Sequence, residues 1–198
     1  MKKVLFYGDS NTYGYDPRSY YGGRYPEEVR WTCRLREMAA GKWQIAADAM
    51  NGRCIPGSPY SFGELKYAIR NESPLDLCAI MLGTNDLRIS RNPSAEETAR
   101  LMKSVLERLI SENFQRETGS FQILLIAPPP ADAPDEAPAL SRESRKLSSC
   151  YRQIAGDLGI SFADAAEAHA EMAFDGIHFS GKGHARFASW MLRVLASF

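Results

Sequence analysis

The sequence predicts an α/β fold in which a five-stranded parallel sheet carries helices on both faces. Three short apolar runs, at residues 4–7, 77–82 and 123–127, are nearly continuous and end at glycine or proline. Such runs are typical of strands that are buried on both sides. Two weaker strands fit at residues 43–47 and 160–163. Helical patterns alternate with these runs, and this alternation predicts parallel strands joined by right-handed crossovers.

Each predicted helix rests on apolar residues that recur every three or four positions. The stripes are Trp31, Leu35 and Met38; Phe62, Leu65 and Ile69; Leu101, Val105 and Leu109; Leu147, Tyr151, Ile154 and Leu158; and Ala185, Ala188, Leu192 and Leu195. We assign all of them to core packing. Ser61 is the expected N-cap of the second helix, and residues 94–97 match a capping box before the third.

The strand and helix order also predicts where a ligand would bind. It favours the flavodoxin-like order 2-1-3-4-5, a three-layer sandwich whose crevice lies beyond the carboxyl ends of strands 1 and 3. No linker or internal repeat interrupts the chain, so we expect one domain over residues 1–198. Two long loops, at residues 15–30 and 131–140, are expected to be binding elements. The first carries four tyrosines and the second three acidic residues.

Composition excludes several classes of partner. Lys plus Arg and Asp plus Glu both count 24, so the formal charge is zero, and no basic field indicates nucleic acid. The apolar run after the first lysines stops at Gly8, too short for a signal peptide, and no stretch approaches a membrane span. Four cysteines without CxxC spacing fit a reducing compartment. We expect a cytoplasmic protein with no membrane partner, whose zero net charge leaves self-association open.

Residues suited to acyl transfer follow the predicted strands on one sheet edge. Ser10 follows the first strand, and Asp175 and His178 follow the last by a longer route. A serine hydroxyl is a weak nucleophile until a base takes its proton, and histidine suits that task. The spacing DxxH lets the carboxylate reach Nδ1, which leaves Nε2 for the serine.

The same edge offers hydrogen-bond donors for an oxyanion. The candidates are the backbone N–H of Ser10, the backbone N–H of Gly52 after the second strand, and the side-chain amide of Asn85 after the third. Glycine at position 52 would let the backbone approach a substrate closely. The sequence therefore predicts a complete acyl-transfer site.

Each part alone has a more ordinary explanation. Glycine, asparagine and aspartate form turns, and a lone DxxH is common. Asp9 and Asp86 are expected to cap or brace loops, and His169 and His184 to lie on helices, packed or exposed. Cys54 is a rival nucleophile, but no aspartate–histidine pair is tied to it in sequence. A flavodoxin-like nucleotide binder that cradles a phosphate at residues 8–14, without catalysis, also stays open.

Taken together, the segments Gly8-Asp9-Ser10, Gly52, Gly83-Thr84-Asn85-Asp86 and Asp175-Gly176-Ile177-His178 resemble the SGNH-hydrolase family, also called GDSL-type esterases. Arg30-Trp31-Thr32, Ile80-Met81-Leu82, Pro128-Pro129-Pro130 and His178-Phe179-Ser180 are similar to its bacterial arylesterase/acyltransferase branch. The resemblance implies a flavodoxin-like fold, a triad of Ser10, Asp175 and His178, no metal and no cofactor. It also implies oligomeric relatives.

The sequence departs from the family pattern at Asn11, which stands where the name motif has leucine, and matches the branch only loosely around Gly52. We expect Asn11, Tyr13 and Tyr15 to contact the substrate. The predicted activity is that of a serine esterase on small carboxylic esters, with short acyl or aryl groups, through an acyl-enzyme. Acyl transfer to alcohols and deacetylation of carbohydrates would use the same centre.

Overall fold

Five parallel strands form the centre of the structure, which is a computed structural model, in the order β2-β1-β3-β4-β5. They are β1 (Lys2–Gly8), β2 (Trp43–Ala49), β3 (Leu77–Met81), β4 (Gln122–Ala127) and β5 (Ser161–Asp164). The structure describes residues 1–198 except 20, 22 and 134–136. The predicted fold class and strand order are confirmed.

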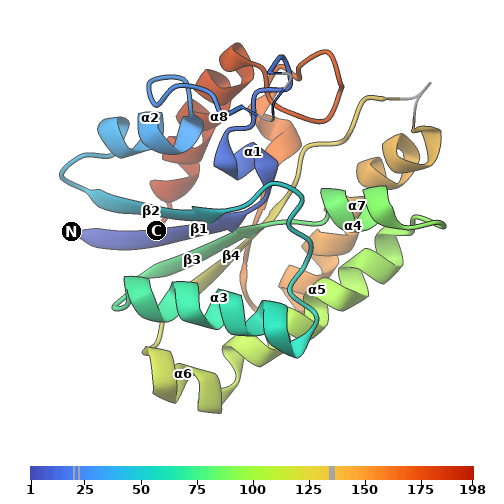
Figure 1. Cartoon of the computed structure of the whole chain (residues 1–198). Helices are drawn as coiled ribbons and strands as arrows, with labels where there is room; N and C mark the ends of the chain where they lie inside the picture. The colour runs from blue at the N-terminus through green and yellow to red at the C-terminus, as the bar shows by residue number, and fades with distance from the viewer. Residues whose placement is uncertain (20, 22, 134–136) are drawn as a thin grey trace.

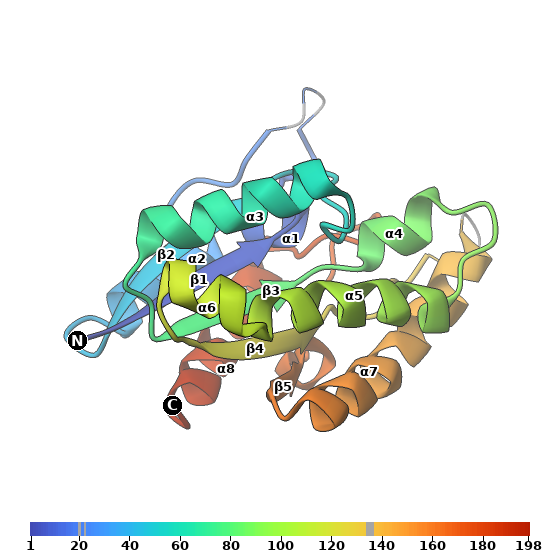
Figure 2. The ribbon, with the colours of Figure 1, turned by 90° about the horizontal axis from the view of Figure 1, so that it is seen from below.

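Helices cover both faces of the sheet (Figure 1). One face carries α2 (Trp31–Met38) and α8 (Gly181–Leu195); the other carries α3 (Pro59–Glu72), α5 (Ala95–Ile110), α6 (Glu112–Thr118) and α7 (Pro138–Leu158). Viewed from below, α3, α5 and α6 lie in front of the strands (Figure 2). Among the described residues, no helix is both long and apolar enough to cross a membrane.

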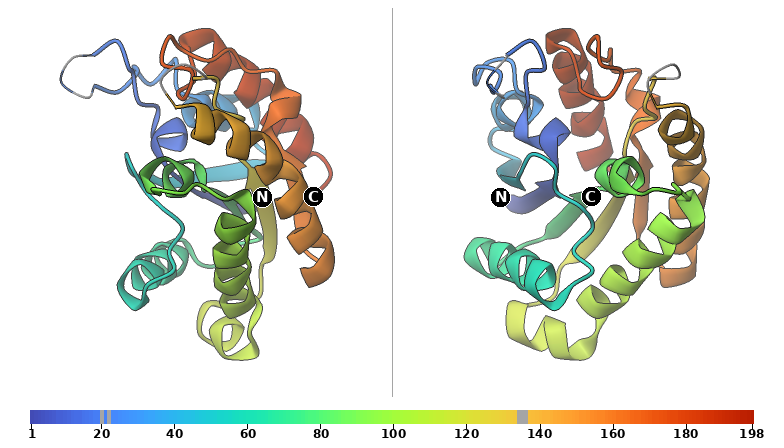
Figure 3. Two further views of the ribbon diagram at one scale, coloured as in Figure 1. Left: turned by 90° about the vertical axis from the view of Figure 1, so that its right-hand side faces the viewer. Right: turned by 45° about the vertical axis from the view of Figure 1, so that its right-hand side comes forward.

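The central strands β1, β3 and β4 are mainly apolar because both of their faces are covered. In β1, Leu5 and Tyr7 join the core under α3, α5 and α7, whereas Val4 and Phe6 join the core under α2 and α8. Successive side chains of a strand point to opposite faces, so each strand contributes to both cores. Figure 3 shows the resulting helical layers on either side of the sheet.

Several local predictions were wrong. The N-cap of α3 is Ser58, whose hydroxyl accepts the Ser61 N–H while the Ser61 hydroxyl accepts the Ser58 N–H. A capping box thus explains why a serine at position 61 looked like a cap. The box predicted before α5 is only half formed, because Ser94 accepts the Glu97 N–H but its hydroxyl donates to Glu96.

Three short helices and one loop boundary also differ from the predictions. The helices α1 (Ser10–Tyr13), α4 (Thr84–Ile89) and α6 carry no long apolar stripe, and the patterns did not indicate them. The predicted loop 131–140 ends early, because α7 begins at Pro138, where proline suits the first helical turn. Parts of the two predicted loops, residues 20, 22 and 134–136, lie outside the described residues.

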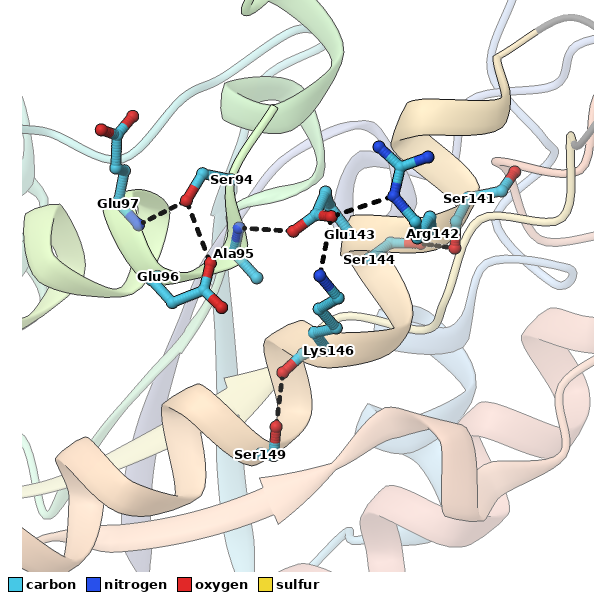
Figure 4. Close-up of polar contacts among 10 residues, drawn as sticks. All are labelled: Ser94, Ala95, Glu96, Glu97, Ser141, Arg142, Glu143, Ser144, Lys146 and Ser149. Atoms are coloured by element: carbon cyan, nitrogen blue, oxygen red, sulfur yellow. Dashed lines mark hydrogen bonds and ion pairs between the residues drawn. The ribbon is translucent and has the colours of Figure 1, made fainter. Parts of the chain in front are cut away.

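A buried carboxylate ties α7 to the start of α5 (Figure 4). Glu143 accepts the N–H of Ala95 at 3.2 Å and pairs with Arg142 and Lys146 at 3.2 and 2.9 Å. A negative charge at a helix N-terminus is favourable, because the first N–H groups of the helix have no partner within it. The contact therefore fixes α7 against α5 within the helical layer that covers β3 and β4.

Candidate active site

The nucleophile candidate lies where β1 passes into the short helix α1. Asp9 is the N-cap of α1, and its carboxylate accepts the Asn11 N–H at 3.0 Å. Gly14, at φ +85°, ends the helix. Ser10 is therefore the first helical residue, and its N–H makes no hydrogen bond within the described part of the chain.

Ser10, His178 and Asp175 form one hydrogen-bonded line. Ser10 Oγ lies 2.9 Å from His178 Nε2, and His178 Nδ1 lies 2.5 Å from Asp175 Oδ2. The other oxygen of Asp175 accepts the N–H groups of Ile177 and His178, both at 3.0 Å. Burial would raise the pKa of Asp175, but the hydrogen bonds from the His178 ring and from these N–H groups lower it below its ordinary value. The carboxylate is thus held ionised against the imidazole.

The loop that carries Asp175 and His178 is held in place by the chain segment around Asp132. Gly176 has φ +64°, and a Cβ there would lie 2.0 Å from the carbonyl oxygen of Asp132. The Asp132 N–H donates to the Gly176 carbonyl at 2.7 Å. In α7, Ser144 and Ser141, both labelled in Figure 4, accept the N–H groups of Ala131 and Ala133 at 3.0 Å. These residues were not identified from the sequence, where no local pattern pairs Asp132 with Gly176.

Asn11 has a different environment from the one predicted. It is 4% exposed, and its amide donates to the Ile177 carbonyl at 3.0 Å and accepts the Phe179 N–H at 2.8 Å. Both polar atoms of the side chain are therefore engaged by the protein. The amide faces the chain on either side of His178, and the predicted contact between Asn11 and substrate stays a prediction.

Asn85 and Asp86 hold the loop that contains Gly52. Asn85 Nδ2 donates to the Arg53 carbonyl at 3.0 Å, and Asp86 accepts the Ile55 N–H at 3.1 Å. The Arg53 guanidinium in turn donates to the Gly8 carbonyl at 3.1 Å, just before α1. An amide nitrogen carries two hydrogens, so Asn85 keeps one that is not used by Arg53.

Gly52 itself is exposed at φ +75°, with open space where a Cβ would stand. Its N–H makes no hydrogen bond within the described residues. The glycine is therefore explained by its left-handed backbone conformation. The predicted close approach of this backbone to a substrate stays a prediction.

The two tyrosines predicted to contact substrate have different surroundings. The Tyr15 ring lies against His178, with ring centroids 4.6 Å apart and planes tilted by 54°. The Tyr13 ring lies under the Arg24 guanidinium at 4.2 Å, and Arg24 also donates to the Tyr13 carbonyl at 2.6 Å. Tyr15 thus borders the site directly, whereas Tyr13 faces a residue of the 15–30 loop.

The alternative reactive residues are placed unfavourably for nucleophilic or base chemistry. Burial, with Asp86 and Asp9 nearby, raises the pKa of Cys54 to about 11, so its thiol is protonated near neutrality. Asp9 caps α1, and burial raises its pKa to about 6. His169 is exposed just after η1 (Ala165–Ala168), at φ +46°, and is not on a helix as predicted. His184 is buried in α8.

Solved structures of two related activities share this architecture. A protein from Agrobacterium tumefaciens str. C58 assigned as an arylesterase aligns at TM-score 0.87 and 29% identity, covering 100% of this chain and 99% of that chain. Est24, a carbohydrate acetylesterase from Sinorhizobium meliloti, aligns at TM-score 0.84 and 27% identity, covering 100% and 99%. The aryl esterase of M. smegmatis aligns at TM-score 0.82 and 25% identity, again covering 100% and 99%. A search of curated proteins found no match.

The fold and these neighbours define a serine hydrolase of carboxylic esters. Residues 6–186 match the GDSL-like Lipase/Acylhydrolase family, and the chain belongs to that family. The resemblance found in the four sequence segments is therefore confirmed.

Proposed function

We propose that the chain hydrolyses small carboxylic esters with short acyl or aryl groups, using Ser10 as the nucleophile. The observation that carries the proposal is the hydrogen-bonded line from Ser10 Oγ through His178 to Asp175, at 2.9 and 2.5 Å. Nucleophile and base within hydrogen-bond distance, with the base oriented by a third group, are what covalent catalysis needs.

The reaction would proceed in two steps through an acyl-enzyme. Ser10 Oγ attacks the ester carbonyl carbon while His178 Nε2 takes the hydroxyl proton. The alcohol leaves with that proton, and the acyl group remains on Ser10. Water then attacks the acyl carbon, Nε2 takes its proton, and the carboxylic acid leaves as the proton returns to Ser10. Asp175 keeps Nδ1 protonated and stabilises the transient imidazolium.

The negative charge that develops on the carbonyl oxygen would meet three donors. The N–H groups of Ser10 and Gly52 have no partner within the described residues, and Asn85 keeps one amide hydrogen. All three adjoin the carboxyl end of β1, because the Gly52 loop is bonded to Gly8 through Arg53 and to α4 through Asn85. Preorganised donors of this kind stabilise the transition state without reorganisation.

A fluorophosphonate probe tests the nucleophile directly. We expect the probe to modify Ser10 alone, as mapped by mass spectrometry of peptides, and Ser10→Ala to abolish both labelling and turnover. Cys54→Ala is the matched control for the rival nucleophile and should keep both. An adduct on any other residue would remove Ser10 from its role.

Carbohydrate acetyl esters are the second candidate substrate, because one of the similar solved proteins is a carbohydrate acetylesterase. A hydrolysis panel separates the two: aryl esters of increasing acyl length on one side and acetylated oligosaccharides on the other. The same panel run with added primary alcohol measures whether acyl transfer competes with hydrolysis. A yellow purified protein that hydrolyses none of the esters would instead support a flavin binder.

We also propose a single-domain, cytoplasmic protein that self-associates. Zero net charge and exposed aromatic side chains on α3, with Tyr60 at 78% and Tyr67 at 68% exposure, support association. Light scattering at micromolar concentration tests it. A monomer at every concentration would contradict it.

A further inference from the structure

We propose that Asn11 is a positioning residue that fixes the distance between Ser10 and His178, so that the departure from leucine in the family's name motif has a catalytic purpose. This inference rests on the proposed function, since it concerns how the proposed nucleophile and base are held together. It assigns no contact between Asn11 and the substrate.

The Asn11 amide acts as a substitute for a neighbouring strand. It accepts the N–H of Phe179 at 2.8 Å and donates to the carbonyl of Ile177 at 3.0 Å. These two backbone groups bracket His178. On the other side of the same segment, the Ala173 N–H donates to the His178 carbonyl at 2.7 Å and the Ser180 N–H donates to Glu171 at 2.9 Å. The histidine segment is thus paired on both sides, and one partner is the residue next to Ser10.

Asn11 is itself fixed at every polar atom. Its N–H donates to Asp9 at 3.0 Å, and its carbonyl accepts the indole N–H of Trp31 at 2.9 Å. Trp31 is 1% exposed and packs edge-on against Phe6 and Phe187, with ring centroids 4.9 Å apart in both pairs. Phe187 in turn packs against Phe179, again at 4.9 Å. The bonds from Asn11 to the histidine segment therefore close a ring of contacts that runs through the core under α2 and α8.

Leucine at position 11 could not make either bond. The Phe179 N–H and the Ile177 carbonyl have no other hydrogen-bond partner within the described residues. Leaving a buried backbone donor unpaired is costly, so the segment would shift to find water or another partner. A shift of about 1 Å between nucleophile and base is enough to reduce turnover roughly a hundredfold.

The test is a double-mutant cycle on the full-length chain with an aryl acetate as substrate. We expect Asn11→Leu and Asn11→Ala to lower kcat by at least about thirtyfold and to change KM by less than about twofold, because the substrate itself is not contacted. In a His178→Ala background the same substitutions should lower kcat by less than about twofold, because Asn11 acts through the histidine. Thr118→Val is the matched control: it removes a buried side-chain hydrogen bond, to Phe114 at 3.0 Å, far from the site. It should lower the melting temperature and leave kcat unchanged.

Three results would overturn the proposal. One is a folded Asn11→Leu or Asn11→Ala protein with kcat within about threefold of wild type. Another is an equally large loss of kcat in the presence and absence of His178. Failure of both variants to fold would assign Asn11 a structural role and also reject the proposal. The proposed function fails separately, if Ser10→Ala keeps its turnover.

Discussion

His178 and His184 are six residues apart in the sequence and both lie against aromatic rings, but their surroundings differ. His178 has Asp175 at Nδ1 and Ser10 at Nε2, in a loop whose side chains are partly open to solvent. His184 is 1% exposed in the first turn of α8. Its Nδ1 accepts the Trp31 N–H at 3.4 Å, and its Nε2 has no hydrogen-bond partner among the described residues.

The difference shows how burial and neighbouring charges together decide what a histidine can do. Burial, together with the positive charges of Arg34 and Arg30, lowers the pKa of His184 to about 4. An imidazole without a carboxylate cannot stabilise the positive charge that a general base acquires. Asp175 supplies that carboxylate to His178 alone, and its place three residues earlier is the feature that the sequence displayed.

Replacing each histidine should break the comparison most strongly. His178→Ala should lower kcat by roughly 10⁴-fold, because no base remains for Ser10. His184→Phe should keep kcat within about threefold, since its ring packs against Tyr25 and Phe179 and does not contact Ser10. Both kcat values are to be measured on folded protein at pH 8. The reverse order of effects would mean that His184 is the base.

The proposed role of Asn85 as an oxyanion donor can be tested next, with a smaller expected effect. Asn85→Ala should lower kcat by about 10²- to 10³-fold with a modest change in KM, because its free amide hydrogen acts on charge that develops in the transition state. The substitution also removes the bond to the Arg53 carbonyl. Melting temperature and kcat must therefore be measured on the same preparation. A destabilised variant with normal kcat would leave Asn85 only the task of bracing the Gly52 loop.

Sequence reasoning worked where the signal is periodic or compositional. Continuous apolar runs predicted β1, β3 and β4 because both faces of these strands are covered. Apolar stripes at helical spacing predicted α3 and α7 because one face of each helix packs on the core. The position of Ser10, Asn85 and His178 at one edge followed from the parallel order of the strands.

What escaped prediction depends on contacts between distant segments. Asn11 was predicted to contact substrate because it follows Ser10, and nothing local shows that its hydrogen-bond partners are 166 and 168 positions away. The contact of Asp132 with Gly176 is equally non-local. Short helices such as α1 and α4 were missed because a single turn carries no apolar stripe.

A pair of glycines sharpens the account of the His178 loop. Gly176 and Gly159 both have φ +64°, but only Gly176 stands against another chain segment, the Asp132 carbonyl. Gly159→Ala should cost about 1 kcal/mol of stability, the ordinary cost of a left-handed alanine, and keep kcat. Gly176→Ala should cost about 3 kcal/mol and lower kcat at least about tenfold, because Asp132 must move and shift the loop. Urea unfolding and kcat distinguish the two, and equal effects would show that the Asp132 contact is dispensable.

The smallest effect concerns the pH dependence of stability at His184. Its pKa is lowered from 6.5 to about 4 in the folded protein, so the unfolded chain takes up the proton first as pH falls. The stability contributed by neutral His184 is therefore complete above about pH 6.5 and is lost between that pH and about pH 4. His184→Phe removes this loss.

The unfolding free energies of His184→Phe and wild type should consequently converge or cross on acidification, by about 2–3 kcal/mol between pH 7 and pH 4.5. Asp9, whose pKa is raised to about 6, gives the opposite slope, but it is present in both proteins and cancels in the difference. Urea titrations at the two pH values measure the change. Parallel curves would show that His184 titrates normally in the folded protein, and the contrast with His178 would then rest on Asp175 and Ser10 alone.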